Sequence, residues 1–144
     1  MTALSSLMDE LADQIRAAVV AVTDIDIQVE PRMVMSPSPP SIDIYPAPDS
    51  RDTTSAGYGD LDGAYMLTVR ARVDPSDHDA GQDVLLAFMD DEDDLCIAAA
   101  IEDDPTLNGL AASVDVVSTS GFGSFADGAY VGCQWTVRII NATS

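Results

Sequence analysis

Positive charge is scarce in this chain. It contains no lysine, so its six basic residues are all arginines, whereas 25 residues are acidic and the formal net charge is -19 at pH 7. Such a protein repels nucleic acid and anionic membranes at contact distance, which argues against sequence-specific nucleic-acid binding. The acidic, lysine-free composition suits a salt-adapted organism or a high-G+C coding sequence, and it does not choose between the two.

Cysteine and histidine, which commonly build redox and metal sites, are also scarce. Cys96 and Cys133 are the only cysteines and fall in apolar periodic segments, where free thiols usually act as small core hydrophobes. We expect no disulfide, and this interpretation implies a reducing cytoplasm. The only histidine, His78, has no second histidine or cysteine at a metal-ligand spacing.

The stretch around His78 is better explained as the start of a helix. Asp74 is the expected N-cap, Pro75 the first helical residue, and Asp77 lies at the third position, near the positive end of the helix dipole. This interpretation places His78 on an exposed first turn.

Long apolar runs are absent as well. The chain does not start with a basic segment followed by an apolar one, and no apolar run approaches the roughly 18 residues of a membrane span. We therefore expect no membrane partner and no secretion. The length of 144 residues and the 47% of hydrophobic residues fit one domain, 1–144, with a proper core.

Apolar residues that recur every three or four positions predict an amphipathic helix near the N-terminus. These residues are Leu4, Leu7, Met8, Leu11, Ile15, Ala18, Val19 and Val22. A central pair of helices is expected at 75–89 and 95–102, where apolar residues again recur at helical spacing.

Alternating or continuous apolar residues predict strands at 25–29, 41–45, 64–73, 112–119 and 129–140. The 41–45 strand lies within the proline-rich part of the chain and is expected at an edge. Long loops are expected at 46–62 and 120–128. The order of elements predicts an α+β fold, with the N-terminal helix and the central helix pair packed on a largely antiparallel, twisted sheet.

No motif for catalysis is present, and we expect neither enzyme activity nor a cofactor or metal. GFGSF, Gly121 to Phe125, is not a nucleophile elbow, because its serine follows the second glycine. GDLDG, Gly59 to Gly63, lacks the first and twelfth ligands of an EF-hand loop. The acidic run Asp90 to Asp94 is expected to connect the two central helices and to cap the second.

The arginines of the two longest predicted strands form a candidate subunit interface. Arg70, Arg72 and Arg138 alternate with the apolar rows, with Thr68, Gln134 and Thr136 beside them. One interpretation is pairing with aspartates of the same chain on an open face of the sheet. The other is a basic stripe that meets the acidic surface of another copy.

The whole arrangement resembles the tail terminator (tail completion) proteins of long-tailed phages. The resemblance is carried by SSLMDELADQIRAAV, SIDIYP, YMLTVRARV running into AGQDVLLAFMDD, LCIAAAIEDDPTLNGLAASVDVVS, and GAYVGCQWTVRII. The last stretch has the aromatic-x-x-x-x-W-T-V pattern typical of small phage tail and neck proteins, and the resemblance spans nearly the full chain.

This resemblance implies a structural virion protein that assembles in the host cytoplasm and resides in the tail or neck. It implies a homo-oligomeric ring, of six copies, that caps the tail tube and joins it to the head-neck connector while DNA passes through without specific binding. Loops of such proteins reach the tube and neighbouring subunits, which makes Arg51, Tyr58, Phe122 and Phe125 candidate loop contacts.

Two alternatives stay open. The chain is also compatible with another neck or tail component, such as a head-closure or tail-tube protein. From a different class, an acidic host module could sequester a basic partner by mimicking nucleic acid. The acidic residues are dispersed over predicted helix caps, loops and solvent-facing sides of helices and strands. This distribution favours general surface charge over mimicry of nucleic acid.

Overall fold

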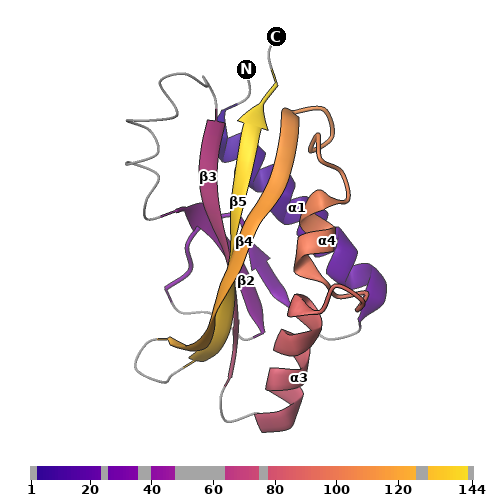
Figure 1. The fold of residues 1–144 in the computed structure, drawn as a ribbon, viewed down its shortest axis with the longest axis vertical. Helices are drawn as coiled ribbons and strands as arrows, with labels where there is room; N and C mark the ends of the chain where they lie inside the picture. Colours follow the sequence, from indigo (N-terminus) through magenta and orange to yellow (C-terminus); the bar gives the residue numbers. More distant parts are fainter. Residues whose placement is uncertain are drawn as a thin grey trace.

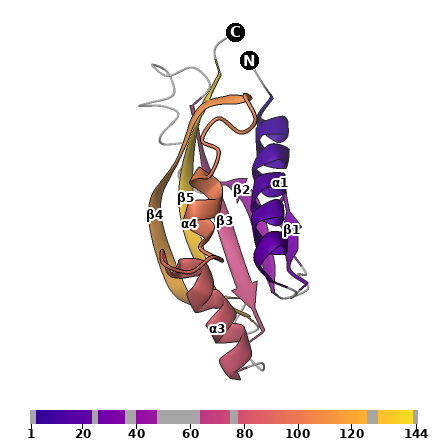
Figure 2. The same ribbon diagram turned by 90° about the vertical axis from the view of Figure 1, so that its right-hand side faces the viewer.

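The computed structural model describes residues 3–23, 26–35, 40–47, 64–74, 78–125 and 130–142. Its elements, in chain order, are α1 (Leu4–Val22), β1 (Gln28–Glu30), β2 (Ser41–Pro46), β3 (Ala64–Val73), α3 (His78–Met89), α4 (Ile97–Glu102), β4 (Ala111–Phe125) and β5 (Tyr130–Asn141). The five strands form one sheet in the order β1-β2-β3-β5-β4. The helices lie against one face of this sheet (Figures 1 and 2), which confirms the predicted α+β fold.

The sheet is largely antiparallel, as predicted, with one exception. β2 pairs with β3, β3 with β5 and β5 with β4 in antiparallel fashion, whereas β1 and β2 are parallel. The predicted bounds of the 64–73 strand are confirmed, and β5 begins and ends one residue later than predicted. Both strands lie inside the sheet, with neighbours on either side.

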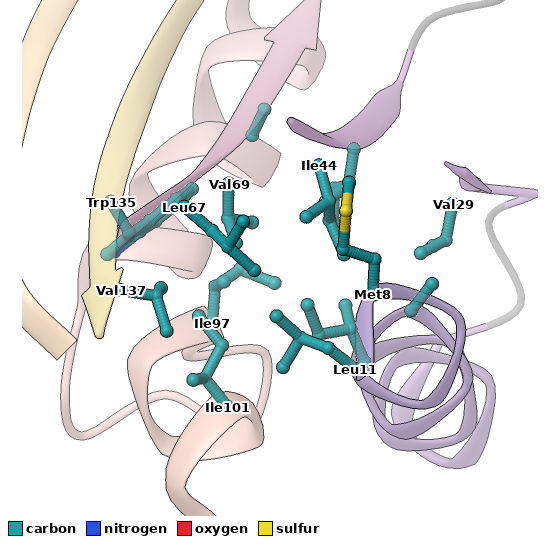
Figure 3. Close-up of a cluster of buried hydrophobic side chains, with 14 of the residues drawn as sticks. Met8, Leu11, Val29, Ile44, Leu67, Val69, Ile97, Ile101, Trp135 and Val137 are labelled. Carbon is teal, nitrogen blue, oxygen red and sulfur yellow. The ribbon is translucent and has the colours of Figure 1, made fainter. Parts of the chain in front are cut away.

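The core lies between the helices and the inward face of the sheet. Figure 3 shows side chains from two helices and four strands pointing toward one another: Met8, Leu11, Val29, Ile44, Leu67, Val69, Ile97, Ile101, Trp135 and Val137. Trp135 is the largest fully buried side chain. The predicted apolar rows of β3 and β5 therefore do face the core, and both cysteines are buried free thiols there, as expected.

The prediction that the 41–45 strand lies at an edge was wrong. β2 lies between β1 and β3, and its residues Ser41 to Tyr45 are all buried. The neighbouring prolines did not prevent this, because Pro40 and Pro46 lie just outside and at the end of the paired segment. The three-residue strand β1 takes the edge position instead.

The predicted loop at 120–128 is a strand over its first half. β4 continues through Ser120 to Phe125, still paired with β5. Its pairing shifts register between Ala111 and Ser113, between Val116 and Ser118, and between Ser120 and Gly123. At each shift β4 has one more residue than β5, as in a β-bulge, and the glycine-rich segment stays in the ladder.

Other predicted segments lie partly outside the described residues. α3 is described from His78, so the proposed cap at Asp74 to Asp77 is not tested, and neither is the side chain of His78. Of the predicted 46–62 loop, Pro46 belongs to β2, Ala47 donates a backbone hydrogen bond to Met66, and 48–62 lie outside the described part.

The acidic run does connect α3 and α4, as predicted. Its side chains organise the connection itself: Asp90 accepts from the Glu92 N–H, and Asp93 accepts from the Leu95 N–H. The N-cap of α4 is Cys96, which forms no side-chain capping bond. The expected side-chain cap was therefore wrong, because the acidic residues end before the helix begins.

Candidate functional site

A buried ion cluster lies on the face of the sheet opposite the helices. The Asp43 side chain is 1% exposed, and its carboxylate accepts hydrogen bonds from Arg70 Nε at 3.1 Å and Arg70 Nη2 at 2.6 Å. Arg72 Nη2 donates to the same carboxylate at 3.1 Å. Asp43 pairs with Arg70 in the β2–β3 register, and Arg72 lies two residues along β3, so the alternation of strand side chains puts all three on one face.

The cluster also binds the backbone of the segment between β1 and β2. Asp43 Oδ2 accepts from the Val34 N–H at 2.9 Å, and the Val34 carbonyl accepts from Arg72 Nη2 at 2.8 Å and Arg70 Nη2 at 3.4 Å. Because β1 and β2 are parallel, their connection must cross the sheet from one end to the other. The cluster holds part of that connection in place.

The two arginines differ in their pKa shifts and in how many of their guanidinium nitrogens have hydrogen-bond partners. Burial lowers the pKa of Arg70, but the hydrogen bonds and charge of Asp43 outweigh it, so the pKa of Arg70 is raised overall. For Arg72 burial prevails and the pKa is lowered, even though the charge of Asp43 opposes it. Arg72 Nε is buried without a hydrogen-bond partner. Arg70 is therefore the main partner of Asp43.

Aromatic rings complete the surroundings of both guanidinium groups. Arg70 Cζ lies 4.9 Å from the centroid of the Tyr45 ring, and Arg72 Cζ lies 5.6 Å from that of Tyr130. Both distances are within the range of cation–π attraction. The arginines thus occupy a site built within the chain, with the Arg70 and Arg72 side chains only 14% and 5% exposed.

The other described arginines are paired too, in more exposed positions. Arg16 Nη1 lies 2.6 Å from Asp13, Arg32 Nη1 lies 3.0 Å from Asp9, and Arg138 Nη2 lies 3.3 Å from Asp115. Every arginine in the described part of the chain therefore has a carboxylate partner in the same chain. Of the two interpretations of the arginine stripe, the structure shows the pairing within the chain.

The face that carries the stripe is not open where the prediction placed it. Thr68 is 3% exposed and Arg72 is 4% exposed, so neither side chain is available at the surface. Gln134 is partly buried on β5, opposite Arg70, and Arg138 is exposed. Thr136, opposite Thr68, is also partly buried. The six residues of the candidate interface thus lie on one face, but only Arg138 among them is well exposed.

The candidate loop contacts are only partly described. Phe122 is 47% exposed and lies on β4, within the sheet rather than on a loop. Phe125 is the last residue of β4, opposite Tyr130, and its side chain is outside the described part. Arg51 and Tyr58 also lie outside the described residues.

Asp43 was not singled out by sequence reasoning, although a signal was present. In SIDIY the aspartate is the one charged residue of a short strand, and its side chain points to the same face of the sheet as those of Ser41 and Tyr45. A charge between two isoleucines is the pattern expected when a buried partner of opposite charge lies across the ladder. Which strand supplies that partner depends on the register.

The described residues contain no grouping typical of metal or thiol chemistry. Among them, no three histidine, cysteine or acidic side chains are placed to hold a metal ion. Burial raises the pKa of Cys133 to about 12, so this thiol stays protonated and unreactive at neutral pH.

The pKa of Asp104 is lowered because its carboxylate accepts hydrogen bonds from the Thr106 hydroxyl and from the N–H groups of Asn108 and Thr106. These hydrogen bonds form a turn after α4.

An open groove separates the last turns of α1 from α4, and sequence reasoning did not predict it. Its volume is about 270 Å³. The walls are mostly small or apolar: Ala18, Val22, Cys96, Ala99 and Ala100. Two aspartates, Asp94 and Asp103, complete the lining. Small side chains of α1 and α4 line the groove. The sequence alone does not tell which residues of two distant helices become neighbours.

No protein-family model matches the chain, and no curated protein matches it. Among the described residues, no helix has the length and apolar character needed to cross a membrane.

Proposed function

We propose that this chain is a structural virion protein, a tail terminator that assembles into a ring, caps the tail tube and joins it to the head-neck connector of a long-tailed phage. The proposal begins from the resemblance in the sequence, which implies an α/β or α+β domain. The α+β fold of the chain agrees with that expectation. The proposed role is assembly rather than catalysis.

The distribution of charge carries the proposal. The chain has 25 acidic and six basic residues, and each described arginine lies in an ion pair with an aspartate of the same chain, Arg70 and Arg72 sharing Asp43. Little positive charge is left to bind phosphates, so a channel lined by copies of this chain would repel DNA. DNA would then pass through the ring without being retained.

Contacts between copies are then expected to rely on apolar and main-chain groups. Val117 and Phe122 on β4 are 53% and 47% exposed, and Leu86 on α3 is 51% exposed. β4 is also an edge strand, and no other described strand pairs with its outer side. Contacts between the copies of the proposed hexameric ring would use such surfaces rather than Arg70 and Arg72. Contacts of the ring with the tube and connector proteins would use them too.

The proposal is tested by measuring the mass of the purified protein by light scattering during a titration with NaCl and MgCl₂. Screening should reduce repulsion between copies, so we expect a discrete step from monomer to one closed oligomer, visible as rings by electron microscopy. Adding the tail-tube protein of the same genome should place these rings at tube ends. A monomer at every condition that also leaves tube ends bare would overturn the proposal.

An acidic binding module is the second candidate, and one observation favours it. The side chains of Asp90, Asp91, Glu92, Asp93 and Asp94 are all exposed in a single short connection, where they concentrate negative charge. A monomer that binds basic nucleic-acid-binding proteins tightly, and that DNA displaces, would favour this function over the ring.

A further inference from the structure

The groove between α1 and α4 is a surface feature that the proposed function does not use. Ala18 and Val22 of α1 form one wall, and Ala99 and Ala100 of α4 form the other. Gln14, one turn before Ala18, fixes the two helices together by donating from Nε2 to the carbonyls of Ala100 and Ile101, both at 2.9 Å. These two hydrogen bonds hold the helices together beside the groove, since one of them is accepted by Ala100, which lines it.

The size of the groove limits what it can hold. Pockets for drug-sized ligands and cofactors usually enclose about 300–1,000 Å³ and bury most of the ligand. This groove measures about 270 Å³ and is open to solvent. It is therefore suited to a single side chain presented by another molecule rather than to a free cofactor.

The lining selects the kind of side chain. Alanine and valine walls favour an aliphatic stem, whereas the negative charge of Asp94 and Asp103, two exposed residues of the lining, favours a positive charge at its tip. Lysine and arginine have this composition, since they lay a methylene stem along apolar surface and keep the charged head in contact with water or a carboxylate. Neither Asp94 nor Asp103 takes part in an ion pair among the described residues.

We infer that the α1–α4 groove is a docking site for a lysine or arginine side chain of a partner protein with a basic surface. The partner is a different protein, because this chain has no lysine and every described arginine already has an aspartate partner in the same chain, Arg70 and Arg72 sharing Asp43. The inference goes beyond the proposed function and holds for any basic partner, whether or not the chain forms a ring.

The test uses nuclear magnetic resonance on the full ¹⁵N-labelled chain, with an acetylated and amidated Gly-Arg-Gly peptide as the probe and Gly-Gln-Gly as its neutral control. We expect saturable shifts of the Ala18, Val22, Ala99 and Ala100 amides with the arginine peptide alone. Affinity should be on the order of 1 mM and should fall with added salt, since a single exposed ion pair contributes little.

Matched variants separate the groove from the general negative charge of the protein. Asp94→Asn with Asp103→Asn removes the groove carboxylates and should weaken binding about fivefold or more. Asp91→Asn with Glu92→Gln removes equal charge from exposed side chains of the same connection, outside the groove, and should change the affinity by less than about twofold. Ala99→Leu fills the groove and should abolish the shifts while the rest of the spectrum keeps its folded dispersion.

Three results would overturn the inference. An equal loss of binding in the two charge variants would mean that the peptide follows net charge rather than the groove. Binding that survives Ala99→Leu would mean that no side chain enters. Groove shifts that appear without peptide as protein concentration rises, and that vanish in Arg51→Gln, would identify a second copy of the chain as the occupant.

Discussion

A carboxylate without contact to water is stabilised only by the groups around it, and Asp43 has four hydrogen bonds from Arg70, Arg72 and Val34. Replacing a buried ion pair with apolar groups is often neutral, but removing one partner leaves an uncompensated charge and is costly. In this cluster the single carboxylate serves two guanidinium groups. The negative partner is therefore the one whose loss matters most.

We predict that Asp43→Asn lowers the free energy of unfolding by about 3–5 kcal/mol, because the buried Arg72 and the largely buried Arg70 lose their counter-charge. The matched change is Asp115→Asn, which breaks the Asp115–Arg138 pair between neighbouring strands, whose side chains are 49% and 48% exposed. That change should cost less than about 1 kcal/mol. Urea unfolding of the two variants measures the difference, and equal costs would contradict a structural role for the Asp43 cluster.

Among the elements, α4 depends most on its neighbours, because six residues are too few to form a stable helix alone. Ile97 and Ile101 anchor it in the core, and the side-chain amide of Gln14 in α1 donates hydrogen bonds to two of its last carbonyls. These carbonyls have no partner within the helix. The link from α1 is therefore a C-terminal cap supplied by a residue 86 positions away from the first carbonyl it binds.

We predict that Gln14→Met destabilises the chain by about 1–2 kcal/mol, since it keeps a long, helix-favouring side chain and removes only the amide donors. Ala17→Met, on the exposed face of the same helix, serves as the control and should change stability by less than about 0.5 kcal/mol. Hydrogen exchange adds an independent check, because the amides of α4 should lose protection in the first variant only. Unchanged protection there would show that the cap does not hold α4.

β4 shows a second effect at the scale of elements. Its three register shifts bend an edge strand that would otherwise offer a long, flat ladder to other chains. Bulges of this kind are a common way to discourage uncontrolled edge pairing. Any contact of β4 with another copy would therefore be selective in geometry, which suits a closed ring better than an open polymer.

For the whole molecule, repulsion among carboxylates opposes both folding and assembly. The formal net charge of -19 is spread over 144 residues, and three of the five described ion pairs are partly exposed and contribute little. Screening of the net repulsion should therefore outweigh the weakening of these pairs.

We predict that Tm rises by several degrees between about 0.1 M and about 1 M NaCl, over which the screening length falls from about 10 Å to about 3 Å. Differential scanning fluorimetry at constant protein concentration measures this. The variant that carries Asp91→Asn and Glu92→Gln should show a smaller rise, because it has two fewer negative charges. A Tm that falls with salt would mean that the ion pairs, rather than the net charge, dominate.

Patterns along the chain were enough for much of the fold. Helical spacing from Leu4 to Val22 and strand alternation from Ala64 to Val73 predicted α1 and β3 with the observed bounds. The apolar rows of β3 and β5 were assigned to the core for the same reason, and the cysteines were placed there too. These features follow from local periodicity, which reports directly which side of an element is apolar.

Other features were decided only by the tertiary structure, because they depend on which elements become neighbours. The register of β2 against β3 brings Asp43 to Arg70 and Arg72, and so places two residues of the candidate interface in an ion cluster within the chain. Pairing with β5 keeps Ser120 to Phe125 in a strand despite its glycines. The α1–α4 groove likewise arises where small side chains of two distant helices meet, and such contacts leave no period in the sequence.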